Sequence, residues 1–220
     1  MAQKYGRWIC QALMRSRLSI CILPILSFAV LMQPSVVPQS TQPPNCLLGM
    51  PNAPIRMEVF SDFQCPGCRI FYMETVTKLL REYSSSNKVC IIYHEFPLDS
   101  HAYSRQAARY SLAAQRVGRT QWLAVIDALY KKQMLWERDG KIDQALIGAV
   151  STQDLIRIKS IAMEPYIKEA LDRDIALGEK RDVRKTPTVF WTALNTGPQK
   201  IDQEILPYDT WKRNIDRVVK

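Results

Sequence analysis

Glycine, histidine and dense positive charge are all scarce in this chain of 220 residues, which has 8 glycines and 2 histidines. So little glycine excludes a collagen-like chain, no glycine-rich phosphate-binding motif occurs, and six cysteines are too few for a disulfide-stapled miniprotein. The net charge is +9, but no run of five Lys or Arg exists, so nucleic-acid binding is not expected. With 47% hydrophobic and 23% charged residues, the composition is that of a globular protein.

The amino-terminal segment has the pattern of an export signal. Four basic residues up to Arg17 precede a mostly apolar run from Leu18 to Met32, and no charged residue occurs between Arg17 and Arg56. We therefore expect residues 1–33 to be a signal peptide or a membrane anchor, with the rest of the chain in the periplasm or cell envelope. Cleavage and anchoring both stay open, because no clear small-x-small cleavage site is present.

Residues 34–54 are rich in proline, glutamine, serine and threonine, which is typical of an extended tether. Cys46 lies in this segment, and we interpret it as a spare thiol in preference to one that pairs with a partner. Cys10 and Cys21 belong to the leader and are given no catalytic role.

The remaining chain, residues 55–220, alternates strand and helix patterns. A strand at 55–60, a helix at 68–83 and a strand at 88–96 predict a βαβ unit with parallel strands. A helical block follows at about 99–182, and in it we expect one helix to end at Leu177 before Gly178. A strand at 188–191, a short strand near Ile201 and a helix at 208–219 complete a βαβ, helical block, ββα order. Cys90 falls in the second strand, so we interpret it as a packed core thiol.

The chemistry of this chain is expected at Cys65 and Cys68, which open the first helix directly after the first strand. Their spacing lets two sulfurs close a small ring, and the helix amino terminus stabilises a thiolate at Cys65. Pro66 suits the first helical turn, where its missing N–H has no cost. We predict that Cys65 is the attacking or attacked sulfur, and that Cys68 resolves the mixed disulfide.

Two other interpretations of the cysteine pair stay open: a structural disulfide and half of a zinc site. Zinc usually takes four protein ligands, whereas this chain has no second Cys-x-x-Cys and only His94 and His101 as imidazole donors. We therefore favour redox chemistry and expect no metal site and no organic cofactor.

Three segments resemble DsbA-like thiol:disulfide oxidoreductases of the thioredoxin superfamily. Residues 60–68, FSDFQCPGC, resemble the active-site segment, and residues 93–98, YHEFPL, resemble the second strand and its exit. Residues 185–190, KTPTVF, resemble the loop that carries the superfamily's cis-proline. The resemblance spans about residues 52–220. It implies an α/β thioredoxin fold with a helical insertion.

The resemblance also implies site residues beyond the cysteines. Pro187 is expected to be cis and to lie against the cysteine pair, with Thr186 offering backbone groups to an extended substrate. Where relatives often have glycine before the Thr-Pro pair, this chain has Lys185, which would lower the pKa of Cys65 if it pointed at the site. Glu58 stands one position before the acid of many relatives and is a candidate proton acceptor for Cys68. Gly67 replaces a bulkier residue or histidine, which is expected to make the disulfide less oxidising.

We interpret the chain as an exported enzyme that donates disulfides to folding proteins through Cys65 and Cys68. The resemblance implies protein thiol substrates and a membrane quinone-linked partner of the DsbB or vitamin-K-epoxide-reductase type. Three alternatives remain: a reductase or isomerase, a metal-binding or metal-delivery module, and a binding protein whose cysteines only staple the fold.

Overall fold

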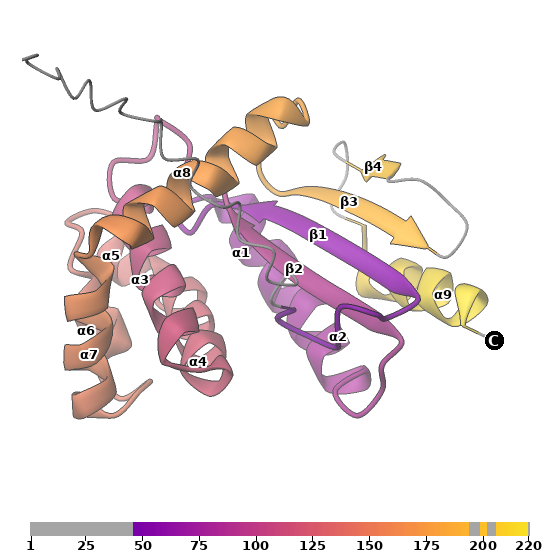
Figure 1. Ribbon diagram of the computed structural model, residues 1–220, viewed down its shortest axis with the longest axis horizontal. Coiled ribbons are helices and arrows are strands. Elements are labelled where there is room, and N and C mark those ends of the chain that lie inside the picture. The colour runs from indigo at the N-terminus through magenta and orange to yellow at the C-terminus, as the bar shows by residue number, and fades with distance from the viewer. Residues whose placement is uncertain (1–45, 194–198, 202–205, 220) are drawn as a thin grey trace, which may run out of the picture. The chain divides into compact units, whose positions relative to one another are not determined.

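A four-stranded sheet lies at the centre of the structure, a computed structural model that describes residues 46–193, 199–201 and 206–219 (Figure 1). Its strand order is β2-β1-β3-β4. The first two strands are parallel and β1 is antiparallel to β3, so the predicted parallel βαβ unit is confirmed. The strands are β1 (Ile55–Ser61), β2 (Val89–Glu95), β3 (Thr188–Ala193) and β4 (Gln199–Ile201).

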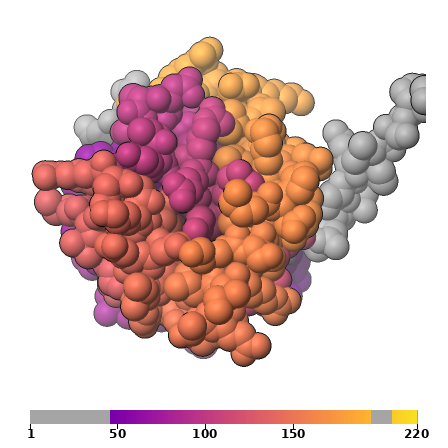
Figure 2. All heavy atoms as spheres, turned by 90° about the vertical axis from the view of Figure 1, so that its left-hand side faces the viewer, coloured from indigo at the N-terminus to yellow at the C-terminus, as the bar shows by residue number. Residues whose placement is uncertain are grey.

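The helices form two groups, one against the sheet and one in the insertion. The first group is α1 (Pro66–Phe71), the π-helical turn η1 (Tyr72–Val76), α2 (Thr77–Glu82) and α9 (Tyr208–Val218). The second is α3 (Ser104–Val117), α4 (Arg119–Lys131), α5 (Gln133–Trp136), α6 (Ile142–Leu146), α7 (Thr152–Ala162) and α8 (Pro165–Lys180). From the side of the insertion, the segment of α7 and α8 packs beside that of α3 to α6 (Figure 2). The predicted helical insertion is therefore confirmed.

Alternation along the strands divides the core into two layers. On one face of the sheet, Val59 and Trp191 join the large apolar cluster that contains Phe71 of α1 and Trp211 of α9. On the other face, Phe60 and Phe190 pack with apolar residues of α8. This alternation decides which side chains can reach the active site.

Helix α8 continues to Lys180, so the prediction that it ends at Leu177 is wrong. Gly178 is buried inside the helix, and a Cβ there would lie 2.4 Å from the ring of Phe96. The glycine thus gives α8 close access to the sheet instead of ending the helix. The loop that leads to β3 follows α8 directly, from Arg181 onward.

Cys46 and Cys90 form a disulfide that spans 44 residues of sequence. The interpretation of Cys46 as a spare thiol is therefore wrong, and Cys90, although buried as expected, is not a free core thiol. Leu47 N–H donates to Ile91 O at 2.6 Å, and Ile91 N–H donates to Leu48 O at 3.0 Å. The end of the expected tether thus packs on β2, whereas its first residues and the leader lie outside the described part.

None of the helices in the described segments is both long and apolar enough to cross a membrane.

Candidate active site

The two cysteines lie at the start of α1, shortly after the end of β1. Cys65 is the N-cap residue of α1, and Pro66 occupies the first helical turn, as predicted. Both sulfurs are free thiols, and their exposure differs: Cys65 is 9% exposed and Cys68 is 0% exposed. An incoming sulfur can therefore reach Cys65 but not its neighbour.

The environment of Cys65 favours its ionised form. Hydrogen bonding from the Cys68 thiol lowers the pKa of Cys65 most, and the backbone N–H groups of Gly67 and Cys68 at the helix start lower it further. Burial acts in the opposite direction, and the net effect moves the pKa of Cys65 from 9.0 to about 5. Near neutral pH, Cys65 is thus a thiolate, the form that takes part in disulfide exchange.

Cys68 is held in the protonated form. Burial raises the pKa of its thiol well above the usual value, and the charge on Cys65 raises it further. The Asp62 backbone N–H donates to Cys68 Sγ at 3.4 Å. The two sulfurs therefore have opposite preferences, one charged and reachable, the other neutral and enclosed.

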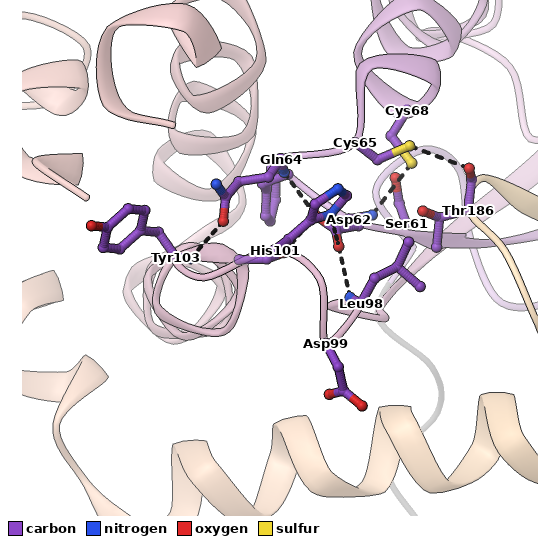
Figure 3. Close-up of polar contacts among 12 residues, drawn as sticks. Ser61, Asp62, Gln64, Cys65, Cys68, Leu98, Asp99, His101, Tyr103 and Thr186 are labelled. Atoms are coloured by element: carbon purple, nitrogen blue, oxygen red, sulfur yellow. Dashed lines mark hydrogen bonds and ion pairs between the residues drawn. The ribbon is translucent and has the colours of Figure 1, made fainter. Parts of the chain in front are cut away.

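The loop before β3 lies against this pair, as Figure 3 shows. The Thr186–Pro187 peptide bond is cis, which confirms the expected geometry of Pro187. As a thiol, Cys65 Sγ donates to Thr186 O at 3.3 Å, and the Thr186 side chain lowers the pKa of Cys65. The Thr186 hydroxyl is buried and has no partner among the described residues apart from this thiolate.

Glu58 does not reach Cys68, because strand alternation places it on the opposite face of the sheet. Its carboxylate accepts hydrogen bonds from Arg181 at 2.8 Å and His94 at 3.3 Å and pairs with Arg56 at 3.2 Å. Although burial raises its pKa, these partners lower it to about 2. The idea that Glu58 accepts a proton from Cys68 is therefore wrong.

Lys185 has an exposed side chain, and it is not among the largest contributions to the lowered pKa of Cys65. Its carbonyl accepts a hydrogen bond from the Thr188 hydroxyl at 2.7 Å, within the loop. Lys185 shapes the loop before β3 through its backbone, and the contacts of the described residues give no support for an effect of its charge on Cys65.

Asp62 organises the segment before Cys65, a role that the sequence analysis missed. Its side chain is 0% exposed and accepts from the Gln64 N–H at 2.7 Å, the Leu98 N–H at 2.7 Å and His101 Nδ1 at 2.8 Å. The Ser104 hydroxyl also donates to it. An Asp two residues before a backbone N–H is a typical turn signal, but its long-range partners have no local signal.

Two glutamines attach the active-site segment to the helical insertion. Gln64 donates to Glu137 O at 2.8 Å and accepts from the Tyr103 N–H at 2.6 Å. Gln133, on α5, donates to the carbonyls of Phe63 at 2.6 Å and Cys65 at 3.2 Å. The insertion therefore positions the backbone that presents the reactive sulfur.

The residues of the metal interpretation are not brought together. Both ring nitrogens of His94 contact carboxylates, Nδ1 that of Asp174 at 3.0 Å and Nε2 that of Glu58 at 3.3 Å, on the face of the sheet away from Cys68. Across the residues that the structure describes, no group of three His, Cys, Asp or Glu side chains could hold a metal ion.

Comparison with known proteins agrees with this geometry. The family model described as Thioredoxin matches residues 41–216. The chain belongs to this thioredoxin family. Its relatives include "Probable disulfide bond formation protein D" of Bacillus cereus, 24% identical over 177 residues that cover 79% of this chain and 78% of the relative. "Disulfide bond formation protein D" of Bacillus subtilis is 24% identical over 202 residues that cover 87% and 82%.

Solved structures with this fold include α-DsbA1 of Wolbachia pipientis, with a TM-score of 0.64 at 20% identity, covering 78% of this chain and 88% of that chain. Oxidised BdbD of Bacillus subtilis has a TM-score of 0.58 at 20% identity, covering 78% and 91%. The thioredoxin fold expected from the resemblance is thus confirmed.

Proposed function

We propose that this chain is a thiol:disulfide oxidoreductase that forms disulfides in other proteins through Cys65 and Cys68. The observation that carries the proposal is the contrast between the sulfurs: Cys65 has a pKa of about 5, while the pKa of buried Cys68 is raised. Stabilising the thiolate stabilises the reduced pair, which makes the corresponding disulfide a stronger oxidant. The names of the two Bacillus relatives support the same direction of reaction.

The reaction follows from which sulfur is reachable. A substrate thiolate attacks Cys65 Sγ of the oxidised pair, the Cys65–Cys68 bond breaks, and its electron pair goes to Cys68, which takes up a proton. A second substrate thiolate then attacks the substrate sulfur of the mixed disulfide. The substrate leaves oxidised by two electrons, and Cys65 leaves as the stabilised thiolate.

Substrate binding is assigned to the loop beside Cys65. The carbonyl of Thr186 lies 3.3 Å from Cys65 Sγ, so an extended peptide that reaches the sulfur can pair with the backbone of this loop. Pro66 and Gly67 follow Cys65 in the first turn of α1, and the Gly67 N–H lowers the pKa of Cys65. We propose protein thiols in an extended conformation as substrates.

The reduced pair must be reoxidised, and we propose a membrane quinone-linked partner, of the DsbB or vitamin-K-epoxide-reductase type. The apolar leader supports a location outside the cytoplasm, in the periplasm or cell envelope, with residues 1–33 as signal or anchor and residues 34–45 as a tether. An exported, oxidising setting also suits the Cys46–Cys90 disulfide.

A redox titration against glutathione, combined with oxidation of a dithiol peptide, tests this function. We expect peptide oxidation that is lost in Cys65→Ser, and a potential nearer the about −120 mV of a strong oxidant than the about −270 mV of thioredoxin. A potential close to thioredoxin's would favour the reductase alternative. Peptide oxidation that survives Cys65→Ser would exclude the proposed mechanism.

A further inference from the structure

Cys68 has to exchange a proton at a site that water does not reach. Its side chain is 0% exposed, yet the sulfur is released as a thiolate each time the disulfide opens. Burial makes that thiolate unfavourable, so a neighbouring group must supply the proton and later take it back. Glu58 cannot do so, because it lies on the other face of the sheet.

Three hydroxyls lie beneath Cys68 on its own face of the sheet, and we call Ser61, Tyr93 and Tyr130 the hydroxyl cluster. All three residues are buried, and Ser61 Oγ lies 2.7 Å from Tyr130 Oη. Ser61 is also within hydrogen-bonding reach of the Cys68 thiol. The Tyr93 hydroxyl is buried without a geometrically satisfactory partner among the described residues. Polar hydrogens are thus available directly beside the sulfur.

Tyr130 is fixed in this position by its neighbours. Its ring packs 4.9 Å from those of Phe63 and Tyr72, and its carbonyl accepts a hydrogen bond from Arg69 Nε at 3.1 Å. Because Tyr130 belongs to α4, the helical insertion contributes one of the hydroxyls to the environment of Cys68. The cluster therefore bridges the sheet and the insertion.

Glu95 lies beside the hydroxyl cluster on the neighbouring strand, close enough to affect the ionisation of Tyr130. It is the register partner of Ser61 across the parallel pair β1 and β2, so the two side chains stand next to each other on the same face. Tyr93, two residues earlier in β2, shares that face. Glu95 is 2% exposed, and its carboxyl group takes no part in the exchange between substrate thiols and Cys65.

Burial and the neighbouring negative charges favour the neutral form of Glu95. Burial raises its pKa most, and the negative charges of Asp174 on α8 and Asp62 after β1 raise it further. A hydrogen bond with Ser111 of α3 acts in the opposite direction. A neutral carboxylic acid in this place has a proton to give.

We propose that Glu95 is the positioning residue that stores the proton exchanged by Cys68, and that the hydroxyl cluster carries this proton between them. When the Cys65–Cys68 bond opens, its electron pair goes to Cys68 Sγ. The Ser61 hydroxyl then gives that sulfur a proton and is resupplied through the tyrosine hydroxyls from Glu95, which becomes a carboxylate. Glu95 then regains a proton from solvent. When Cys68 attacks a mixed disulfide on Cys65, its proton moves along the same route in the opposite direction to the carboxylate form of Glu95, which has first released its own proton to solvent. The inference rests on the thiol–disulfide exchange of the proposed function.

A single-turnover reaction with 5,5′-dithiobis(2-nitrobenzoate) separates the two sulfurs. The full chain is used with Cys10→Ser and Cys21→Ser and with its active-site pair reduced. Attack by the Cys65 thiolate releases one thionitrobenzoate, and attack by Cys68 on the resulting mixed disulfide releases the second. Each release is followed by absorbance from pH 5 to pH 9.

We expect Glu95→Gln to slow the second release at pH 7 by roughly 100-fold, the scale of general acid–base catalysis, and to remove an inflection from its pH profile. The first release should keep its rate. Ser61→Ala, which leaves the carboxyl group in place, should also slow only the second release. Glu58→Gln is the matched control, a buried acid of the same sheet on the opposite face, and should keep the inflection.

The inference is overturned if Glu95→Gln keeps both the rate and the inflection of the second release. It is equally overturned if Glu95→Gln and Ser61→Ala slow both releases alike, because that result indicates a structural role. The small probe needs neither a protein substrate nor a partner, so failure of peptide oxidation alone would count against the proposed function and not against this proton route.

Discussion

Ionisation of Cys65 should contribute measurably to the stability of the reduced protein, and acid should remove that contribution. The folded structure lowers the pKa of Cys65 from 9.0 to about 5. A group whose pKa is lowered by folding stabilises the folded state above its unfolded pKa, and the contribution disappears as pH falls through the folded pKa. For this shift, the thiolate contributes about 3 kcal/mol at pH 7 and less than about 1 kcal/mol at pH 5.

The assay is urea unfolding of the reduced protein and of reduced Cys65→Ser at both pH values. The free energy of unfolding of the wild type, measured relative to Cys65→Ser, should fall by about 2 kcal/mol from pH 7 to pH 5. The comparison cancels the titration of Glu58, His94 and every other shared group. Reducing conditions also leave Cys46 and Cys90 in the same state in both proteins.

The opposite result would refute the thiolate argument. If the difference in unfolding free energy between wild type and Cys65→Ser is the same at pH 5 and pH 7, Cys65 does not ionise in this range. A parallel titration of thiolate absorbance at 240 nm gives an independent value for the pKa of Cys65, which should be near 5 rather than near 9.0.

Three further outcomes are expected. Replacing both Cys46 and Cys90 by alanine should lower the free energy of unfolding by about 4 kcal/mol, because the disulfide closes a loop across a sequence separation of 44 residues. The pKa of Cys65 should not change. Urea unfolding measures the first effect and thiolate absorbance the second. Folding raises the pKa of His94 to about 8, so protonated His94 should add about 2 kcal/mol to the free energy of unfolding relative to His94→Gln. This contribution is complete below pH 6.5 and is lost as pH rises through 8. Urea unfolding of both proteins at pH 6 and pH 9 tests it. Thr186→Val should raise the pKa of Cys65 by about 1 unit, seen at 240 nm, because a hydroxyl that donates to the thiolate is removed. An unchanged value in the respective experiment contradicts each expectation.

The local features of this fold and site could be predicted from the sequence. Pro66 after Cys65 marked the start of a helix, and the apolar run before it marked β1. These features depend on neighbours within a few residues, which is the range over which propensity and capping act. The DsbA-like motif then added the cis geometry of Pro187, which local propensity alone does not favour.

The missed features depend on contacts between distant parts of the chain. Cys46 and Cys90 meet across 44 residues, and no local pattern indicates which cysteines pair. Asp62 and Gln133 look like ordinary polar residues until the insertion folds back onto the loop before Cys65. Glu58 faces away from Cys68, and the residues that hold its carboxylate there, His94 and Arg181, are distant from it in the sequence.

The bridge between Leu48 and Ile91 matters for a protein proposed to work among unfolded chains. An outer strand with unpaired amides can recruit any extended polypeptide, and clients that have not yet folded are extended. Here the chain's own residues 47 and 48 occupy hydrogen-bonding positions along the outside of β2, secured there by a cross-link. Residues 47 and 48 therefore hinder the addition of a client strand to the edge of the sheet at β2. Contact with clients is then directed to the end of the sheet that carries Cys65.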